Sequence, residues 1–288
     1  MKFKIDFDNL LNTDLHMHTN FSDGKDSPSD MLKSAVKKGM KVVGISDHSY
    51  TFFDESYCIQ REQIEDYNIT VFSLAQKCAQ LKDNPRLSKA LGTDDIRLWA
   101  GIEQDYYSNE PTDCYDYVIG SVHYIRINRD GRDVVPGCHA YMNHIYIPVD
   151  ENPEILLNAA ESYYGGDIYS LIEDYYLIVS DVVNRTNCDI IGHFDLISKF
   201  NEDGRLFDPA NPRYIAAWKK AADALLYSGR IFEINTGAIS RGYRTCAYPS
   251  AEQISYIKEN GGRFIYSSDA HNKENIAFHF ELLQQLDF

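Results

Sequence analysis

The sequence has no pair of cysteines at C-x-x-C spacing and no long apolar run. Its six cysteines are scattered over 288 residues, which argues against a disulfide framework and a zinc ribbon and favours reduced thiols. No window approaches the roughly 18 apolar residues of a membrane span. The first ten residues carry acids where a signal peptide needs an apolar core. We therefore expect a cytoplasmic protein that does not enter a membrane.

Basic residues are also few. Lysine and arginine number 28 against 43 acidic residues, which gives a formal net charge of −15. This balance argues against nucleic acid or an anionic membrane as the main partner, because both attract a basic patch. It does not exclude a small anionic substrate, since metal ions in a cleft can reverse the local charge.

The chain shows neither a linker-like change of composition nor an internal repeat. Hydrophobic residues make up 44% and charged residues 25%, which is the usual mixture of a folded globular protein. We therefore expect one domain over residues 1–288.

A short polar segment near the N-terminus contains two histidines at i and i+2. In D-L-H-M-H-T-N-F-S-D-G, residues 14–24, His16 and His18 alternate with apolar residues, as on a strand with two different faces. Both imidazoles then leave the same face, about 7 Å apart at their origins. Asp23 and Gly24 favour a turn that returns a carboxylate over the strand end. Taken alone, a half-exposed strand with two histidines explains the pattern equally well.

Predicted strands and helices alternate along the rest of the chain. The strands cover residues 14–18, 41–48, 96–103, 115–123, 189–193, 230–236 and 263–271. Helices are predicted over 27–38, 61–82, 167–187 and 208–229, and from 153, 250 and 273 onward. A polar linker around Pro85 and an irregular excursion over 126–152 complete the chain. Alternation of this kind favours a mostly parallel sheet with right-handed crossovers, arranged as a barrel-like (β/α)7 fold.

Six of the seven predicted strands end in histidine or a carboxylate, at the edge where α/β barrels build their sites. Six of the nine histidines fall at these ends, which random scattering does not explain. The candidate metal ligands are His16, His18, Asp23, His48, Glu103, His123, His193, Asp269 and His271.

Such a set suits more than one metal ion. A mononuclear catalytic zinc uses about three protein ligands, so nine candidates suit two or three ions, with Glu103 placed to bridge. Clustered cations generate hydroxide at neutral pH and hold a transferring phosphoryl group. Nitrogen-rich donors with carboxylates favour Zn, Fe or Mn over Mg or Ca.

The order of these motifs resembles the PHP (polymerase and histidinol phosphatase) superfamily. D-L-H-M-H-T and S-D-G match its first motif and S-D-H its second, and G-I-E, G-S-V-H, G-H-F-D and S-D-A-H follow in order. The resemblance implies a distorted (β/α)7 barrel with a trinuclear site at the carboxyl ends of the strands. The family's ligands then fall on the nine candidates above, although many relatives use a histidine near Asp23.

Longer segments resemble the histidinol-phosphatase branch: D-Y-V-I-G-S-V-H-Y-I, I-I-G-H-F-D-L-I-S-K-F and F-E-I-N-T-G. This implies a phosphomonoesterase that hydrolyses L-histidinol phosphate in histidine biosynthesis through a metal-bridging hydroxide, with Asp269, His271 and His193 as catalytic residues. The chain departs from the branch over 139–176 and 240–244. The alternatives are a phosphatase for another small phosphoester, a nuclease-type domain and a silent metal-binding scaffold.

Three cations lie on loops that follow the predicted strands and are candidates to bind the phosphate of a small phosphorylated metabolite. They are Lys199, Arg241 and Arg244. An arginine fork matches two phosphate oxygens at once. The alternative for each is a solvated loop charge.

Overall fold

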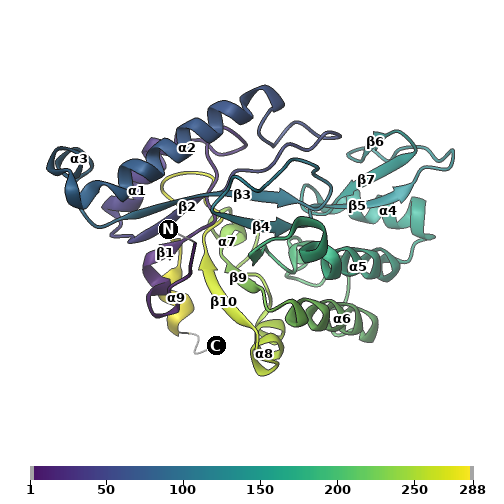
Figure 1. Cartoon of the computed structure of the whole chain (residues 1–288). Coiled ribbons are helices and arrows are strands. Elements are labelled where there is room, and N and C mark those ends of the chain that lie inside the picture. The colour runs from purple at the N-terminus through teal and green to yellow at the C-terminus, as the bar shows by residue number, and fades with distance from the viewer. Residues whose placement is uncertain (1–2, 286–288) are drawn as a thin grey trace.

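A computed structural model describes residues 3–285 and contains a parallel sheet of seven strands (Figure 1). In spatial order they are β1 (Thr13–Asp14), β2 (Val42–Ile45), β3 (Arg97–Asp105), β4 (Tyr117–Ser121), β8 (Ile190–Ile191), β9 (Ile231–Asn235) and β10 (Arg263–Ser267). Beyond β1 and β10 the chain forms a parallel bridge between Met17 and Ala270, and His18 N donates to Ala270 O at 2.9 Å. The sheet is therefore nearly closed, which confirms the predicted barrel-like fold of seven strands.

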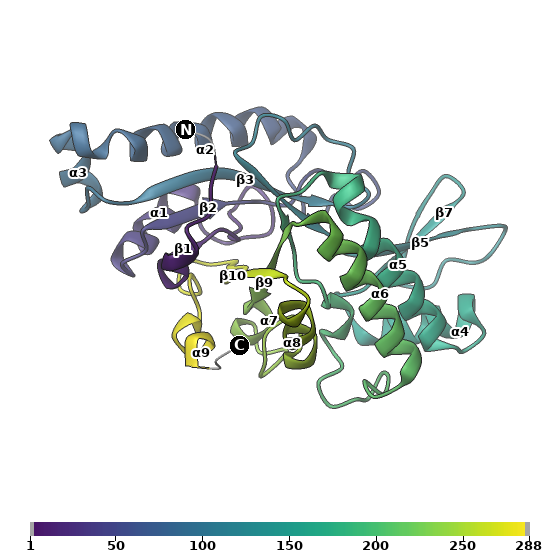
Figure 2. The same cartoon turned by 60° about the horizontal axis from the view of Figure 1, so that its bottom comes forward.

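Helices cover the outside of this sheet. They are α1 (Pro28–Lys37), α2 (Ile64–Ala79), α3 (Pro85–Leu91), α4 (Pro153–Tyr164), α5 (Ile168–Thr186), α6 (Pro212–Ser228), α7 (Gly237–Ser240), α8 (Ala251–Glu259) and α9 (Phe280–Gln285). Figure 2 shows α5 and α6 packed side by side, with α2 on the other side of the barrel. Within residues 3–285, no helix is long and apolar enough to cross a membrane.

Two helix starts follow the predicted capping chemistry. The Ser27 side chain accepts a hydrogen bond from Asp30 N, and Pro28 occupies the first helical position of α1. At α8, Ser250 and Gln253 form the reciprocal capping box. These caps fix where the chain turns back after each strand.

The segment 126–152 differs from the prediction of an irregular excursion. It contributes to an antiparallel sheet of β5 (Tyr124–Asn128), β7 (His144–Pro148) and β6 (His139–Tyr141), in that order. Isoleucines alternate along β5 and β7, and the side chains of Ile125, Ile145 and Ile147 are buried. The glycines and prolines nearby obscured this alternation. In Figure 1 this small sheet extends beyond the carboxyl ends of β3 and β4.

Three helix boundaries also differ from prediction. The expected linker around Pro85 is helix α3, because the Asn84 side chain caps Leu87 N and Pro85 takes the first position. The helix expected from residue 208 begins at Pro212, where Asn211 provides the cap. The last helix, expected from residue 273, begins at Phe280. An Asn-Pro cap sets the start of α3 and of α6, and a turn precedes α9.

The barrel interior changes from apolar to polar along the strands. On β3, Trp99 and Glu103 share the interior face, with Gly101 between them. Trp99 belongs to a buried apolar cluster that closes one end of the barrel, together with Leu15, Tyr117, Ile119, Ile190 and Ile265. Tyr117 fills this end so closely that a Cβ on Gly44 would lie 2.0 Å from its hydroxyl. Polar side chains of the interior face are therefore gathered at the carboxyl end.

Candidate metal centre

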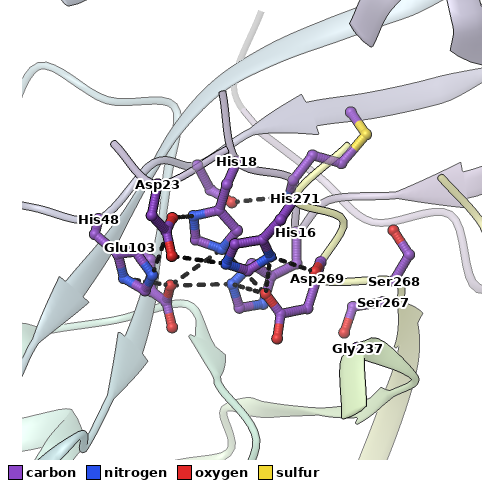
Figure 3. A network of polar contacts seen from close by, with 12 residues as sticks. His16, His18, Asp23, His48, Glu103, Gly237, Ser267, Ser268, Asp269 and His271 are labelled. Atoms are coloured by element: carbon purple, nitrogen blue, oxygen red, sulfur yellow. Dashed lines mark hydrogen bonds and ion pairs between the residues drawn. The ribbon is translucent and has the colours of Figure 1, made fainter. Parts of the chain in front are cut away.

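The structure brings the nine predicted donors together at the carboxyl end of the barrel. Figure 3 shows seven of them, without His123 and His193. Glu103 lies within β3, whereas the other donors follow the strands rather than end them. The other donors lie beyond the strand ends because five strands are shorter than predicted, namely β1, β2, β4, β8 and β10. The isolated bridges of His48 to Glu103 and of Met17 to Ala270 continue the strand direction into the site. Most donors therefore follow directly on the strands, whereas Asp23 lies in a turn and Asp269 adopts a left-handed backbone conformation, with φ of 48°.

Glu103 is the centre of the cluster and is 1% exposed. Its Oε2 lies 2.9 Å from His48 Nδ1, 3.2 Å from His16 Nε2 and 3.4 Å from His18 Nε2. Its Oε1 lies 2.9 Å from the Nε2 of His193 and 3.6 Å from the Nε2 of His123. One carboxylate thus faces five imidazoles, which is the arrangement expected of a bridging ligand.

Two further carboxylates complete the cluster. Asp23 Oδ2 lies 3.0 Å from His271 Nε2, and Asp23 Oδ1 lies 3.7 Å from both His18 Nδ1 and His48 Nε2. Asp269 Oδ1 lies 3.1 Å from His18 Nε2. The backbone of α7 passes so close that a Cβ on Gly237 would lie 2.6 Å from Asp269 Oδ2. Only glycine therefore leaves this carboxylate in place.

The donor atoms fit divalent cations. Three groups each place their ligand atoms within 4.8 Å of one another: His18, Asp23, His48 and His271; His16, His18 and Glu103; and His48, Glu103 and His123. Several of these atoms are buried without a hydrogen-bond partner among residues 3–285, namely His16 Nε2, both ring nitrogens of His18, His48 Nδ1 and Glu103 Oε2. Buried polar atoms are normally paired, so these point to a ligand such as a metal ion.

The electrostatics agree with this fit. Burial, with the neighbouring His271 and His48, lowers the pKa of His18 to about 3, so its imidazole is neutral and has a free lone pair at neutral pH. Burial alone would raise the pKa of Glu103, but His48 and His16 outweigh it and hold that pKa well below the usual range. The site therefore presents a neutral imidazole beside an ionised carboxylate.

Two buried carboxylates behind the cluster were missed from the sequence. Glu233 Oε2 lies 2.9 Å from His16 Nδ1, and Asp105 Oδ2 lies 3.2 Å from His123 Nδ1. Each carboxylate contacts the ring nitrogen that faces away from Glu103. In metal sites, a carboxylate outside the ligand shell often holds a ligating imidazole in this way. The signal was available: Glu233 interrupts an apolar strand, and Asp105 follows Glu103 at i+2 on the same face.

The substitution Glu233→Gln is expected to weaken metal binding about 10- to 100-fold, because the amide cannot orient and polarise the His16 ring as a carboxylate does. Metal affinity is measured by competition with a chromogenic chelator. Glu252→Gln, an exposed acid on α8, is the control and should bind metal as the wild type does. Equal affinity of the Glu233→Gln protein and the control would contradict this role.

The cluster forms the base of a cavity of about 350 Å³. Among the predicted donors, Asp23, His48, His123, His193, Asp269 and His271 line it. The three remaining donors, His16, His18 and Glu103, are at most 1% exposed. A molecule in the cavity therefore meets the donors from one side.

The three predicted phosphate-binding cations differ in position. Lys199 and Arg241 line the cavity. The Lys199 ammonium donates to Asp150 O and Oδ2 at 2.6 and 3.1 Å, and Arg241 Nη2 donates to Asp269 Oδ2 at 3.0 Å. Arg244 is 8% exposed, and its guanidinium donates to Ser198 rather than reaching the cavity that the described residues enclose. Arg244 is thus positioned to orient the turn that carries Lys199.

Fold and donor set together define an α/β barrel protein whose strand ends present donor atoms that suit divalent metal ions. Residues 14–237 match the family model described as the PHP domain, so the chain belongs to the PHP domain family.

Two curated relatives cover most of the chain. A protein of Schizosaccharomyces pombe named "Probable histidinol-phosphatase" is 24% identical over an alignment of 269 positions, which covers 88% of this chain and 78% of the relative. A Deinococcus radiodurans protein with the same name is 26% identical over 278 residues, covering 93% and 89%.

Two solved structures share the fold. A Listeria monocytogenes chain described as a "putative histidinol phosphatase" superposes with a TM-score of 0.69 at 17% identity, covering 94% of this chain and 99% of that one. The histidinol phosphate phosphatase of Lactococcus lactis, complexed with Zn, L-histidinol and phosphate, gives a TM-score of 0.56 at 18% identity, covering 96% and 94%.

Proposed function

We propose that this chain is a metal-dependent phosphomonoesterase that hydrolyses L-histidinol phosphate to L-histidinol and phosphate. The observation that carries the proposal is the set of nine donors at the base of a cavity that Lys199 and Arg241 also line. The names of the two curated relatives and the bound L-histidinol and phosphate of the Lactococcus lactis protein support the same substrate.

The nine donors would hold two or three divalent ions, for which their nitrogen-rich composition favours Zn, Fe or Mn. Bound ions supply Lewis-acid stabilisation of phosphoryl oxygens and activation of water at neutral pH. Glu103 keeps the surrounding imidazoles at a fixed spacing, because each of its oxygens lies within 3.6 Å of two or more rings. The protein thus provides a rigid frame for the reaction.

Lys199 and Arg241 would hold the phosphate. Each is also paired with a carboxylate, which fixes the position of its charged group at the cavity wall. Arg241 also donates to Asp269 O at 3.0 Å, which fixes the plane of its fork. Arg244 would act through Ser198 by holding the turn that carries Lys199.

Proton transfer would fall to cavity-lining members of the cluster. Asp269, His271 and His193 all border the cavity, and Asp269 Oδ1 lies 3.6 Å from His271 Nδ1. These groups are placed to give a proton to the departing alcohol oxygen or to take one from water.

The test combines elemental analysis of the purified protein with turnover of a panel of phosphorylated metabolites. We expect at least two transition-metal ions per chain and the highest kcat/KM for L-histidinol phosphate. A higher kcat/KM for another small ester would assign a different phosphatase substrate. Metal-loaded protein without activity on any ester, including a chromogenic one, would indicate a silent scaffold and overturn the proposal.

A further inference from the structure

The outer part of the cavity has an acidic side that the proposed chemistry does not use. Glu151 and Asp150, which follow β7, line the cavity together with Tyr57 and Tyr124. Beside them, the described residues place Asp54, His139 and Glu151 in a separate group of potential ligands. In the hydrolytic steps described above, Asp150 acts only as the partner of Lys199, and Asp54 and Glu151 have no role.

Glu151 carries negative charge that its neighbours do not cancel. Asp150 is paired with Lys199 at 3.1 Å. Among the described residues, Glu151 forms an ion pair with His139, whose Nε2 lies 3.7 Å from Glu151 Oε1. The same nitrogen lies 3.3 Å from Asp54 Oδ2. Two carboxylates therefore share one imidazole, so the group stays negative whether His139 is protonated or neutral.

Asp54 is fixed by neutral donors and cannot move to relieve this excess. Its side chain is 4% exposed, and it accepts hydrogen bonds from Tyr124 Oη at 2.7 Å and from Ser56 N at 3.0 Å. Glu151, in contrast, has a side chain that is 45% exposed. Its carboxylate is therefore held loosely at the rim and remains available to a cation in the cavity.

A row of rings connects the donor cluster with this rim. The ring centroids of His48 and Tyr57 are 4.8 Å apart, those of Tyr57 and Tyr124 are 6.1 Å apart, and those of Tyr124 and His139 are 5.9 Å apart. At the outer end of the row, His139 Nε2 is buried and has no hydrogen-bond partner within the described chain, so this end of the row points to a bound ligand. A small organic group leaving the cluster therefore lies against aromatic faces.

We propose that Glu151 binds a positively charged group on the leaving alcohol, so that the cavity selects aminoalkyl phosphates over equally sized esters without the amine. The inference rests on the proposed phosphomonoesterase function and specifies the substrate class at the same site. An ammonium group at the rim gains the Glu151 carboxylate and lies beside the tyrosine rings that line the cavity. The phosphate end meets Lys199 and Arg241, so the two ends of the substrate meet opposite charges.

The test compares L-histidinol phosphate with 3-(imidazol-4-yl)propyl phosphate, in which hydrogen replaces the amino group. For the wild type we expect a preference for the amine. In Glu151→Gln the ratio of kcat/KM between the two esters should fall about 3- to 5-fold, mainly through KM, because a half-exposed carboxylate gives a modest interaction. Glu154→Gln is the matched control, since it removes an exposed acid three residues further along. Its ratio should equal that of the wild type.

The inference would be overturned if Glu151→Gln lowered kcat/KM equally for both esters, or lowered it for neither. A second pair, phosphoethanolamine against ethyl phosphate, separates it from the proposed substrate: an amine preference that Glu151→Gln removes would support the inference even if histidinol phosphate were a poor substrate. Calorimetric binding of L-histidinol gives a readout without turnover. Weaker binding to Glu151→Gln than to Glu154→Gln supports the inference, and equal binding contradicts it.

Discussion

Replacing Glu103 by glutamine is expected to lower the metal content and the phosphatase activity together. Glu103 lies within 3.6 Å of five imidazoles and belongs to two of the three groups of ligand atoms. The amide keeps the shape but loses the charge, so it cannot bridge two cations. Since loss of an outer partner alone costs about 10- to 100-fold, we expect loss of this central carboxylate to lower kcat/KM by more than about 100-fold.

The loss of activity should be accompanied by a lower metal content. Elemental analysis of Glu103→Gln, purified beside the wild type, should show fewer ions per chain. Glu110→Gln is the control, because it removes a carboxylate that pairs with the exposed side chain of Arg61. Full metal content and unchanged kcat/KM in Glu103→Gln would contradict the assignment of Glu103 as a bridging ligand.

The donor positions were predictable from sequence for a physical reason. Parallel strands bring their carboxyl ends to one edge, so residues such as His16, Glu103 and Asp269 meet although they lie far apart in the chain. The two-residue period of a strand also placed His16 and His18 in one cluster, although the strand itself is short and continues as bridges.

The surroundings of the site were less predictable, because they depend on contacts between distant segments. The turn after β8 packs against distant segments of the chain. This packing pairs Lys199 with Asp150 and Arg244 with Ser198. The small antiparallel sheet was hidden among glycines and prolines, and with it the placement of His139 beside Asp54. Local patterns thus predicted the donors, whereas the cavity wall required the tertiary structure.

Removal of the metal ions by a chelator is expected to lower the melting temperature and to abolish activity reversibly. Without ions, Asp23, Glu103 and Asp269 are gathered among imidazoles, and atoms such as His18 Nδ1 and Nε2 are buried without partners in the described structure. A ligand that binds only the folded state at 100 times its Kd stabilises it by about 2.7 kcal/mol. At about 2 to 4 °C per kcal/mol for a large domain, one ion corresponds to roughly 5 to 10 °C.

The measurement is a thermal unfolding curve with and without chelator, followed by addition of Zn, Mn or Fe. The melting temperature and activity should return together with the metal that belongs to the site. Glu103→Gln serves as the control, because a protein that has already lost the central carboxylate of the cluster should show a much smaller shift with chelator. If chelated wild type retained its melting temperature after elemental analysis had confirmed metal loss, the cluster would be stabilised by its own ion pairs, and the ions would contribute nothing to the stability of the fold.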